Sequence, residues 1–344
     1  MTNTFSQIVF LFPGQGSQAV GMGKELADEY PVARRTFEEA DEALGYKLSE
    51  LCFEGPEEKL KLTEITQPAI LTASVAAWRV LQERGLQPDF VAGHSLGEYS
   101  AHVAAGTLRF ADAVRTVRNR GKYMQEAVPV GVGAMAAVIG IGIGTGIGTA
   151  GIGVALDKVR EILNEAAQGE VCQTANINSP EQIVISGHAG AVRRAIKLAT
   201  ARGAKKAVSL PVSAPFHCSL MQPAQDRLAR DLSALSFQDP SCPVVCNVDA
   251  AVVDSAEAAR EALIRQVTGT VRWEPSVRLL INKGARLFIE VGPGKVLWGL
   301  MRQIDRSKTC VTVGDLASLQ KTLEQIAATG GLCQEQCSRT EGVA

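Results

Sequence analysis

The sequence is poor in aromatic residues and carries almost no net charge. Aromatic side chains make up 5% of its 344 residues, which leaves little material for a base-stacking surface. A formal net charge of −1 gives no global field that would attract nucleic acid or an anionic membrane. We therefore expect neither nucleic acid nor a membrane as a partner.

No two cysteines are spaced as C-x-x-C, although the chain has eight of them. Cys242 and Cys246, like Cys333 and Cys337, are four residues apart, which is not a usual zinc spacing. A chain of this length does not need disulfides to be stable. The first residues, MTNTFSQIVFLFPG, also lack the basic start and long apolar block of a signal peptide. These absences predict a cytoplasmic protein with reduced thiols and no metal site.

What the chain does have is an alternation of short apolar runs with amphipathic stretches. Hydrophobic residues at 46% and charged residues at 21% are typical of a globular protein. Apolar runs at 8–12 and 90–92 are each followed by helical spacing, and three more lie at 182–186, 243–248 and 286–292. This alternation predicts an α/β fold with a mainly parallel sheet.

The motif that points most directly to a catalytic residue is GHSLG at residues 93–97. A G-x-S-x-G sequence between an apolar run and a helix is typical of a nucleophile elbow, in which the glycines permit a tight turn that exposes the serine. The backbone N–H of Leu96 and the helix N-terminus would then face an oxyanion formed beside Ser95. The pattern predicts a serine nucleophile.

A serine nucleophile needs a base, and we assign that role to His217. This histidine lies in LPVSAPFHCSLM, where two prolines hold an extended loop of the kind that commonly presents catalytic side chains. A dyad of Cys218 with a histidine is the alternative, but adjacent residues in an extended loop point apart. Structural roles are expected for the other histidines, which are His94, His102 and His188.

Eight sequence blocks occur in an order that is specific to one family. They are FPGQGSQ (12–18), GHSLGEYSA (93–101), RGKYMQEAVP (120–129), GAMAAVIG (133–140), NINSP (176–180), PVSAPFHCSLM (211–221), CNVDA (246–250) and VGPGKVLWGLM (291–301). Together they closely resemble the malonyl-CoA:acyl carrier protein transacylases of bacterial fatty-acid synthesis. The resemblance covers nearly all of residues 5 to 320.

The resemblance implies a domain organisation. It implies an α/β-hydrolase-like catalytic domain formed by residues 1–128 and 208–320, interrupted by a small ferredoxin-like α+β subdomain at 129–207. Residues 321–344 are expected to be a loosely ordered C-terminal tail, because the end of the chain has no apolar periodicity. The family also suggests a monomer.

The resemblance further implies the catalytic residues. It makes Ser95 the acyl nucleophile and His217 its base, with the backbone carbonyl of Gln266 orienting the histidine in place of a triad carboxylate. It also places the backbone N–H groups of Gln15 and Leu96 in the oxyanion hole.

A second group of residues is implied to bind the acyl group. Arg120 would pair with the malonyl carboxylate, for which its planar guanidinium is suited because it can pair with two oxygens at once. Phe216 matches the residue found in malonyl-specific relatives. Met124, Asn176 and Asn178 match positions near the pocket.

These assignments predict that the protein moves a malonyl group from malonyl-CoA to the phosphopantetheine thiol of an acyl carrier protein. The reaction would pass through a malonyl-Ser95 ester, in a ping-pong sequence that needs no cofactor. It could serve fatty-acid or polyketide synthesis. A serine esterase or thioesterase is the alternative, which would share the elbow and the histidine but would not need Arg120 or the FPGQGSQ loop.

A basic stretch is a candidate docking site for the carrier protein, which is acidic in this family. Residues 189–210 contain no acid and six cations, which are Arg193, Arg194, Lys197, Arg202, Lys205 and Lys206. A local basic face can steer an acidic partner even when the total charge is near zero. An ordinary solvated helix face is the alternative.

The run IGIGTGIGTAGIG at 141–153 contains GIGTAG, a G-x-G-x-x-G sequence. A dinucleotide site would need an acidic residue about 20 positions later, where VCQTANINS offers none. A membrane span is rejected because the run lies between Ser95 and His217, which must meet in one pocket. Relatives have a short turn at this point, so we expect an inserted loop that is mobile or irregular.

Overall fold

The computed structural model describes residues 7–141, 152–212 and 214–328, and the structural statements below concern these residues. Its strands are β1 (Gln7–Phe12), β2 (Phe90–Gly93), β3 (Gly133–Ile139), β4 (Cys172–Ser179), β5 (Gln182–His188), β6 (Lys206–Ser209), β7 (Val244–Val245), β8 (Val252–Val253), β9 (Ala285–Val291) and β10 (Thr309–Val313).

The helices before the fourth strand are α1 (Lys24–Glu29), α2 (Pro31–Leu44), α3 (Leu48–Glu54), α4 (Glu57–Leu60), α5 (Thr63–Glu83), α6 (Gly97–Ala104), α7 (Phe110–Glu126) and α8 (Ile152–Ala167). Those after it are α9 (Ala189–Ala201), α10 (Gln222–Ser233), α11 (Ala256–Gln266), α12 (Trp273–Asn282), α13 (Val296–Ile304) and α14 (Leu316–Ala328), with a 3-10 turn at Ser219–Met221.

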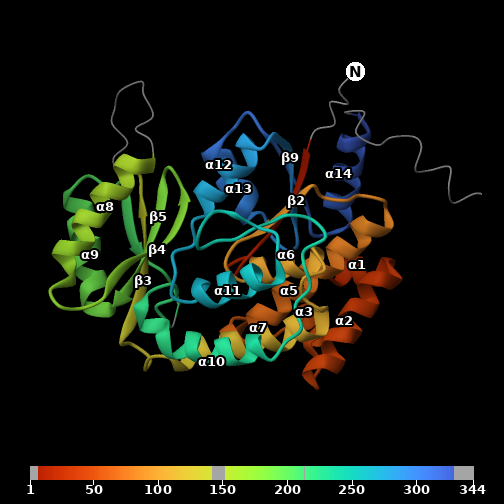
Figure 1. Ribbon diagram of the computed structural model, residues 1–344, viewed down its shortest axis with the longest axis horizontal. Coiled ribbons are helices and arrows are strands. Elements are labelled where there is room, and N and C mark those ends of the chain that lie inside the picture. Colours follow the sequence, from red (N-terminus) through yellow and green to blue (C-terminus); the bar gives the residue numbers. More distant parts are fainter. Residues whose placement is uncertain (1–6, 142–151, 213, 329–344) are drawn as a thin grey trace, which may run out of the picture.

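The strands form two separate sheets. The larger has the order β10-β9-β1-β2-β7-β8, and every pair in it is parallel except β7 with β8. The smaller has the order β4-β5-β3-β6 and is antiparallel throughout. The prediction of an α/β fold with a mainly parallel sheet is therefore confirmed for the larger sheet. Figure 1 shows the smaller sheet with α8 and α9 at the left of the molecule.

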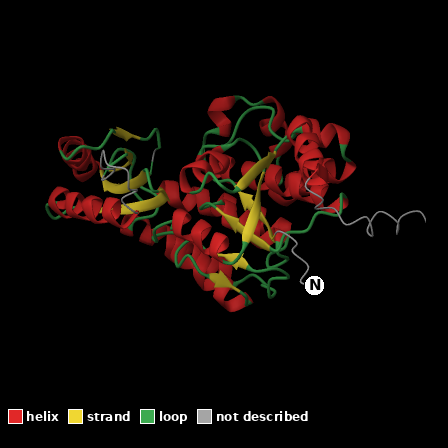
Figure 2. Ribbon diagram, turned by 90° about the horizontal axis from the view of Figure 1, so that it is seen from above, coloured by secondary structure: helices red, strands yellow, loops and turns green. Residues whose placement is uncertain are grey.

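Helices cover both faces of the larger sheet, as the view from above shows (Figure 2). Alternate side chains of a strand point to opposite faces, and β1 illustrates this. Phe10 and Phe12 lie in the core shared with α5 and α7, whereas Val9 and Leu11 lie in the core shared with α12 and α13. Both faces are apolar, as expected for a parallel sheet buried between helices.

The small lobe, which we define as the elements β3 to β6, follows the order β3-α8-β4-β5-α9-β6. It has a hydrophobic core of its own, to which Ala136, Val159, Ile185 and Val192 belong. Its helices α8 and α9 pack on one face of its sheet, while α12 and α13 of the large body contact β4. The sheet of the small lobe thus lies between α8 and α9 on one side and the large body on the other.

Two expectations about secondary structure are corrected by the structure, and a third concerns residues that it does not describe. The apolar run at 243–248 forms only the two-residue strand β7, because the chain turns directly afterwards. Residues 321–328, which were expected to belong to a loose tail, are helical instead, because α14 continues to Ala328 and buries Thr322 and Ile326. The rest of that tail and residues 142–151 of the Gly/Ile run lie outside the described residues.

Within the described ranges, three expected absences can be examined. The six cysteines there are free thiols, and four of them are buried. The same ranges contain no group of three or more His, Cys, Asp or Glu side chains that could hold a metal ion. None of the described helices is both long and apolar enough to cross a membrane.

Candidate active site

A tight turn between β2 and α6 presents Ser95. The backbone φ of Ser95 is 52°, in the left-handed region, which costs a residue with a side chain roughly 1–2 kcal/mol. A Cβ at Gly93 would overlap the backbone of Gly97, and a Cβ at Gly97 would overlap the carbonyl of Phe12. Only glycine fits these two positions, so the G-x-S-x-G spacing follows from the packing of the turn against β1.

The hydroxyl of Ser95 is hydrogen-bonded to His217. The distance from Oγ to Nε2 is 2.7 Å, and Nδ1 of the same ring lies 2.9 Å from the backbone carbonyl oxygen of Gln266. A carbonyl can only accept, so Nδ1 carries the proton and Nε2 accepts from the serine hydroxyl. His217 also has a positive φ, 58°, so both members of this hydrogen bond lie in the left-handed region.

The environment of His217 keeps its ring neutral. The side chain is 4% exposed. Burial, together with the positive charge of Arg120, lowers the pKa of His217 to about 3. A ring with this pKa is free to accept a proton across the neutral range.

Arg120 reaches the same point from α7 and is 1% exposed. Its Nη2 donates to Ser95 Oγ at 3.1 Å and to Gln266 Oε1 at 2.8 Å, and its Nη1 donates to Gln67 Oε1 at 2.8 Å. Its hydrogen-bond partners in the described structure are therefore neutral amides and a hydroxyl, with no carboxylate among them. Burial lowers the pKa of Arg120, yet an arginine stays charged. A buried cation without a contacting anion, beside a nucleophile, is suited to bind an anionic substrate group.

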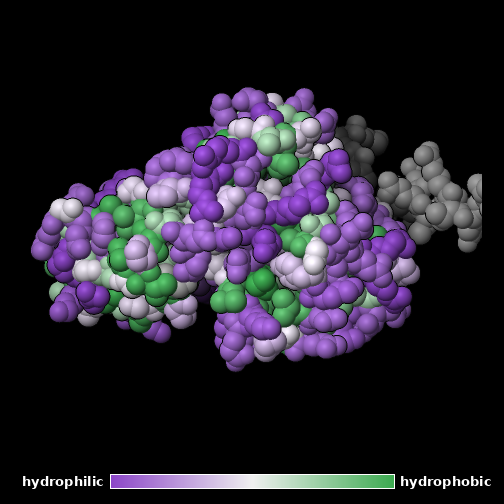
Figure 3. All heavy atoms as spheres, turned by 90° about the horizontal axis from the view of Figure 1, so that it is seen from below, coloured by the Kyte–Doolittle hydropathy of each residue, from purple (hydrophilic) through white to green (hydrophobic). Residues whose placement is uncertain are grey.

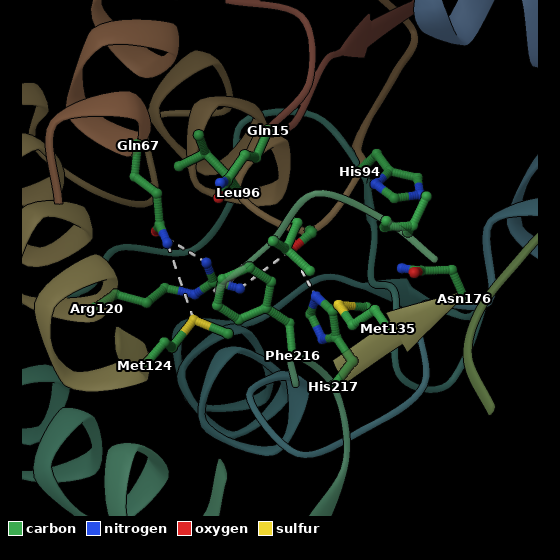
Figure 4. A pocket seen from close by; sticks show the side chains of 13 residues that line it. Gln15, Gln67, His94, Leu96, Arg120, Met124, Met135, Asn176, Phe216 and His217 are labelled. Atoms are coloured by element: carbon green, nitrogen blue, oxygen red, sulfur yellow. Dashed lines mark hydrogen bonds between the residues drawn. The ribbon is translucent and has the colours of Figure 1, made fainter. Parts of the chain in front are cut away.

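These side chains surround a cavity of ≈ 130 Å³. Its lining consists of Gln15, Gln67, His94, Ser95, Leu96, Arg120, Met124, Met135, Asn176, Leu210, Val212, Phe216 and His217. Figure 4 shows Arg120 with Gln67 and Met124 on one side and His94 and Asn176 on the other. Met135 comes from β3 and Asn176 from β4, so the small lobe closes one side of the cavity. Figure 3 shows a notch between the small lobe, at left, and the large body, with hydrophobic side chains on both sides.

Most of the predicted site residues lie together around this cavity. Those that line it are Gln15, Ser95, Leu96, Arg120, Met124, Asn176, Phe216 and His217. Gln266 lies behind them and contacts both His217 and Arg120. Asn178 is outside the lining, where its Oδ1 is 2.8 Å from Nε2 of His94.

The backbone groups near Ser95 suit an oxyanion. Leu96 is the N-cap of α6, so its N–H belongs to the first turn, where backbone donors lack a partner within the helix. Gln15 is exposed on the loop after β1 and lines the same cavity. Both residues line the cavity that holds Ser95, so their backbone N–H groups are candidates for an oxyanion hole.

Three residues that sequence reasoning missed hold this arrangement in place. Gln67 binds Arg120, as described above. Asn247 Oδ1 accepts a hydrogen bond from the backbone N–H of Ser95 at 2.7 Å, and its Nδ2 donates one to the carbonyl oxygen of Gly93 at 2.7 Å. These two bonds connect the two sides of the elbow. Glu98 is fully buried beneath the elbow. Asn247 and Glu98 lie in blocks that the sequence did single out, but no local pattern indicated what they contact.

The remaining histidines have other surroundings, although His94 also lines the cavity. His94 packs edge-on against Trp273, with ring centroids 5.5 Å apart, and its pKa is lowered by burial. His102 is fully buried in α6, which lowers its pKa to about 3. His188 accepts the N–H of Val171 at 2.9 Å. None of the three rings is hydrogen-bonded to Ser95 in the part of the chain that the structure describes.

Cys218 does not form a dyad with a histidine in this structure. Its Sγ lies 3.2 Å from the carbonyl oxygen of Pro215 and 3.6 Å from the Oγ of Ser186. The thiol is buried, which raises its pKa. Cys218 is not among the residues that line the cavity of Ser95 and His217.

The comparisons with known proteins were consistent with one another. A family model described as the acyl transferase domain matches residues 9–336. The chain is 49% identical to the malonyl CoA-acyl carrier protein transacylase of Salmonella typhimurium, over 93% of this chain and 100% of that protein. It is 48% identical to the protein of the same name from Bacillus subtilis, over 93% and 98%.

Solved structures give the same picture. An acyl carrier protein S-malonyltransferase from Vibrio cholerae superposes with a TM-score of 0.87 at 47% identity, covering 92% of this chain and 100% of that one. A type II PKS acyl-carrier protein in complex with its malonyl-transacylase contains a chain that superposes with a TM-score of 0.87 at 47% identity, covering 93% and 100%.

Proposed function

The chain belongs to the acyl transferase domain family, and on this basis we propose that it transfers the malonyl group of malonyl-CoA to the phosphopantetheine thiol of an acyl carrier protein. This activity supplies malonyl units for fatty-acid synthesis. The observation that carries the assignment to this chain is the buried Arg120 guanidinium, which has no carboxylate in contact and lies 3.1 Å from Ser95 Oγ.

In the first half-reaction, His217 Nε2 takes the proton of Ser95 as Oγ attacks the thioester carbonyl. The negative charge that forms on the carbonyl oxygen is stabilised by the backbone N–H groups of Leu96 and Gln15. The C–S bond then breaks, and the imidazolium returns its proton to the leaving coenzyme A sulfur. The product is a malonyl ester of Ser95 and free coenzyme A.

The second half-reaction runs through the same groups in reverse. His217 takes the proton of the carrier protein's thiol, whose sulfur attacks the ester carbonyl. The C–O bond to Ser95 breaks, and the imidazolium returns the proton to Oγ. Throughout, Arg120 pairs with the malonyl carboxylate, while Phe216 and Met124 pack beside the acyl chain and exclude water.

We extend the proposal to the architecture. The large body would be of the α/β-hydrolase kind, because its nucleophile follows a parallel strand and precedes a helix at a sharp turn. The small lobe would be ferredoxin-like, because its element order β-α-β-β-α-β and strand order β4-β5-β3-β6 are those of that fold. The first boundary would be near residue 128, where the chain enters the small lobe. The second would follow Ser209, where β6 ends, because the expected boundary at 207/208 would cut that strand.

Mass spectrometry of the protein after incubation with malonyl-CoA tests this function. We expect a malonyl adduct on Ser95 that persists until carrier protein is added and then moves to the carrier, whereas S95A remains unmodified. Release of malonate without an accumulating adduct would instead indicate the esterase alternative. Acetyl-CoA serves as the comparison substrate, since it carries the same thioester without the carboxylate.

A further inference from the structure

Glu98 is a buried carboxylate that lies behind the active site without touching the cavity. It is 0% exposed and occupies the first turn of α6. Its Oε2 accepts a hydrogen bond from the side-chain Nε2 of Gln266 at 2.7 Å and another from the backbone N–H of Asn247 at 2.9 Å. Burying a carboxylate costs free energy of folding, so the hydrogen bonds that Glu98 makes must offset a penalty that an apolar residue would not incur.

The contact with Gln266 determines which way that amide points. Nε2 of Gln266 also donates to the carbonyl oxygen of Ser95 at 2.9 Å, and Oε1 accepts from Arg120 at 2.8 Å. In the reversed orientation the amide oxygen would face the carboxylate of Glu98, and the amide nitrogen would face the guanidinium. Burial raises the pKa of Glu98 to about 7, so at pH 8 the group is a carboxylate and only accepts hydrogen bonds. Together with the Ser95 carbonyl, it therefore selects the orientation that offers Arg120 an acceptor.

Gln266 contacts both the base, His217, and the proposed anion-binding residue, Arg120. Its backbone carbonyl accepts from Nδ1 of His217, while its side chain holds Nη2 of Arg120. Glu98 also favours the charged guanidinium electrostatically, because its negative charge raises the pKa of Arg120 against the effect of burial. Glu98 therefore acts on the anion binder through the side chain of a residue whose backbone also contacts the base.

We propose that Glu98 is a positioning residue that orients the side chain of Gln266 and thereby aims the guanidinium of Arg120 at the substrate carboxylate. This inference rests on the proposed function, since it assumes that the acyl group carries an anion. It requires that loss of the acceptor at Glu98 harms malonyl transfer more than acetyl transfer. A role in stability alone would affect the two substrates equally.

Glu290 provides a matched control. It is also 0% exposed, and it likewise accepts two hydrogen bonds, from the backbone N–H groups of Leu297 at 3.0 Å and Trp298 at 2.7 Å. These partners belong to α13, and none of the three residues lines the cavity. Replacing Glu290 thus removes an equally buried carboxylate without disturbing Gln266.

The experiment compares kcat/KM for malonyl-CoA and acetyl-CoA at pH 8 in four variants. E98L removes the acceptor and keeps most of the volume, E98D keeps the charge but withdraws it from Gln266, and E98Q keeps a neutral acceptor at full length. E290L is the control. Circular dichroism and thermal melting establish which variants are folded, and E98D tests the proposal if E98L is not.

We expect the malonyl-to-acetyl ratio to fall about tenfold in E98L and severalfold in E98D. It should stay within about threefold of wild type in E98Q and be unchanged in E290L. A folded E98L or E98D with the wild-type ratio would overturn the proposal, as would an equal fall in E290L. Failure of the wild-type protein to prefer malonyl-CoA would instead count against the proposed function, before any variant is considered.

Discussion

Nη2 of Arg120 lies 3.1 Å from Oγ of Ser95, so the residue proposed to bind the substrate's carboxylate is hydrogen-bonded to the nucleophile in the free protein. The same nitrogen donates to Gln266. When a malonyl carboxylate arrives, the guanidinium must share or surrender its bond to Ser95, which frees the lone pairs of Oγ for attack. A substrate without a carboxylate has nothing to offer Arg120 in exchange.

Replacing Arg120 should therefore abolish the preference for malonyl-CoA. Loss of a charge-assisted, bidentate contact in a buried site is worth about 3 kcal/mol, so R120A should lower kcat/KM for malonyl-CoA roughly 100-fold. Transfer from acetyl-CoA should change little. R115A is the control, because Arg115 is a half-exposed arginine on the same helix that pairs with Asp112. An unchanged malonyl preference in R120A would contradict the role given to this residue.

The acid limb of the pH profile should lie well below the ordinary pKa of histidine. Burial and the charge of Arg120 lower the pKa of His217 to about 3, and the base must be neutral to act. Acylation of Ser95, measured by quenching the reaction and mass spectrometry, should thus show no histidine limb from pH 8 down to about 5. Protonation of Glu98, whose pKa burial raises to about 7, should change the rate no more than E98Q does. R120A removes one cause of the low pKa and should move the limb upward. A wild-type limb near pH 6.5 would contradict this prediction.

Asn247 should matter for both acyl-CoA substrates alike. Its side chain joins the N–H of Ser95 to the carbonyl of Gly93, so N247A frees the strained elbow without disturbing the acceptor of Arg120. We expect kcat to fall 10- to 100-fold with malonyl-CoA and acetyl-CoA, at a constant ratio between them. N119A is the control, since Asn119 makes a comparable side-chain bond to Asp231 away from the cavity. A selective loss with one substrate would show that Asn247 acts elsewhere.

The buried carboxyl of Glu290 should make stability depend on pH. Burial raises the pKa of Glu290 to about 7, so the folded protein binds a proton there between pH 4.5 and 7 that the unfolded chain does not. This group's contribution therefore falls as the pH rises through that window. In scanning calorimetry, the melting temperature of E290Q minus that of wild type should increase between pH 5 and pH 8. A constant difference between the two proteins would contradict the shift.

Two exposed cations on α9 should contribute to docking of the carrier protein. Arg193 and Lys197 are exposed and four residues apart, on one face of the helix. Arg194, by contrast, is tied to the carbonyls of residues 166 and 167 and to Glu170, so its charge reversal would disturb the small lobe. R193E/K197E should raise KM for the carrier several-fold and leave KM for malonyl-CoA unchanged.

The control for docking is K283E/R286E. These exposed cations lie where α12 leads into β9, at the amino end of that strand, and the active site is at the carboxyl ends of its neighbours. The control should leave both KM values unchanged. Equal effects of the two double variants would mean that only the total charge matters.

The meeting of Ser95 and His217 could be predicted because its signals are local. The glycines around Ser95 and the prolines before His217 each shape a few residues of chain, and such constraints are written in consecutive positions. The same holds for β1 and β9, whose apolar runs are buried on both faces.

The residues that support the pair could not be predicted in this way. Gln67 and Arg120 are 53 positions apart in the sequence, and Asn247 and Ser95 are 152 apart. The sequence around an amide side chain does not indicate which distant residue it will bind. Strand β6 was missed for another reason. Its burial pattern is exposed at both ends and only half-buried between, so it lacks the apolar run that marks a core strand.

The central place of β1 has a consequence for how the chain is made. Ile8 pairs with Leu287 on β9, although ribosomes release the beginning of a chain long before its end. At typical rates of translation that edge of β1 waits on the order of ten seconds or more for its neighbour. In the meantime this edge of β1 leaves its backbone N–H and C=O groups unpaired, while its side chains are apolar on both faces. We therefore expect a chain that is interrupted before β9 to be prone to aggregation.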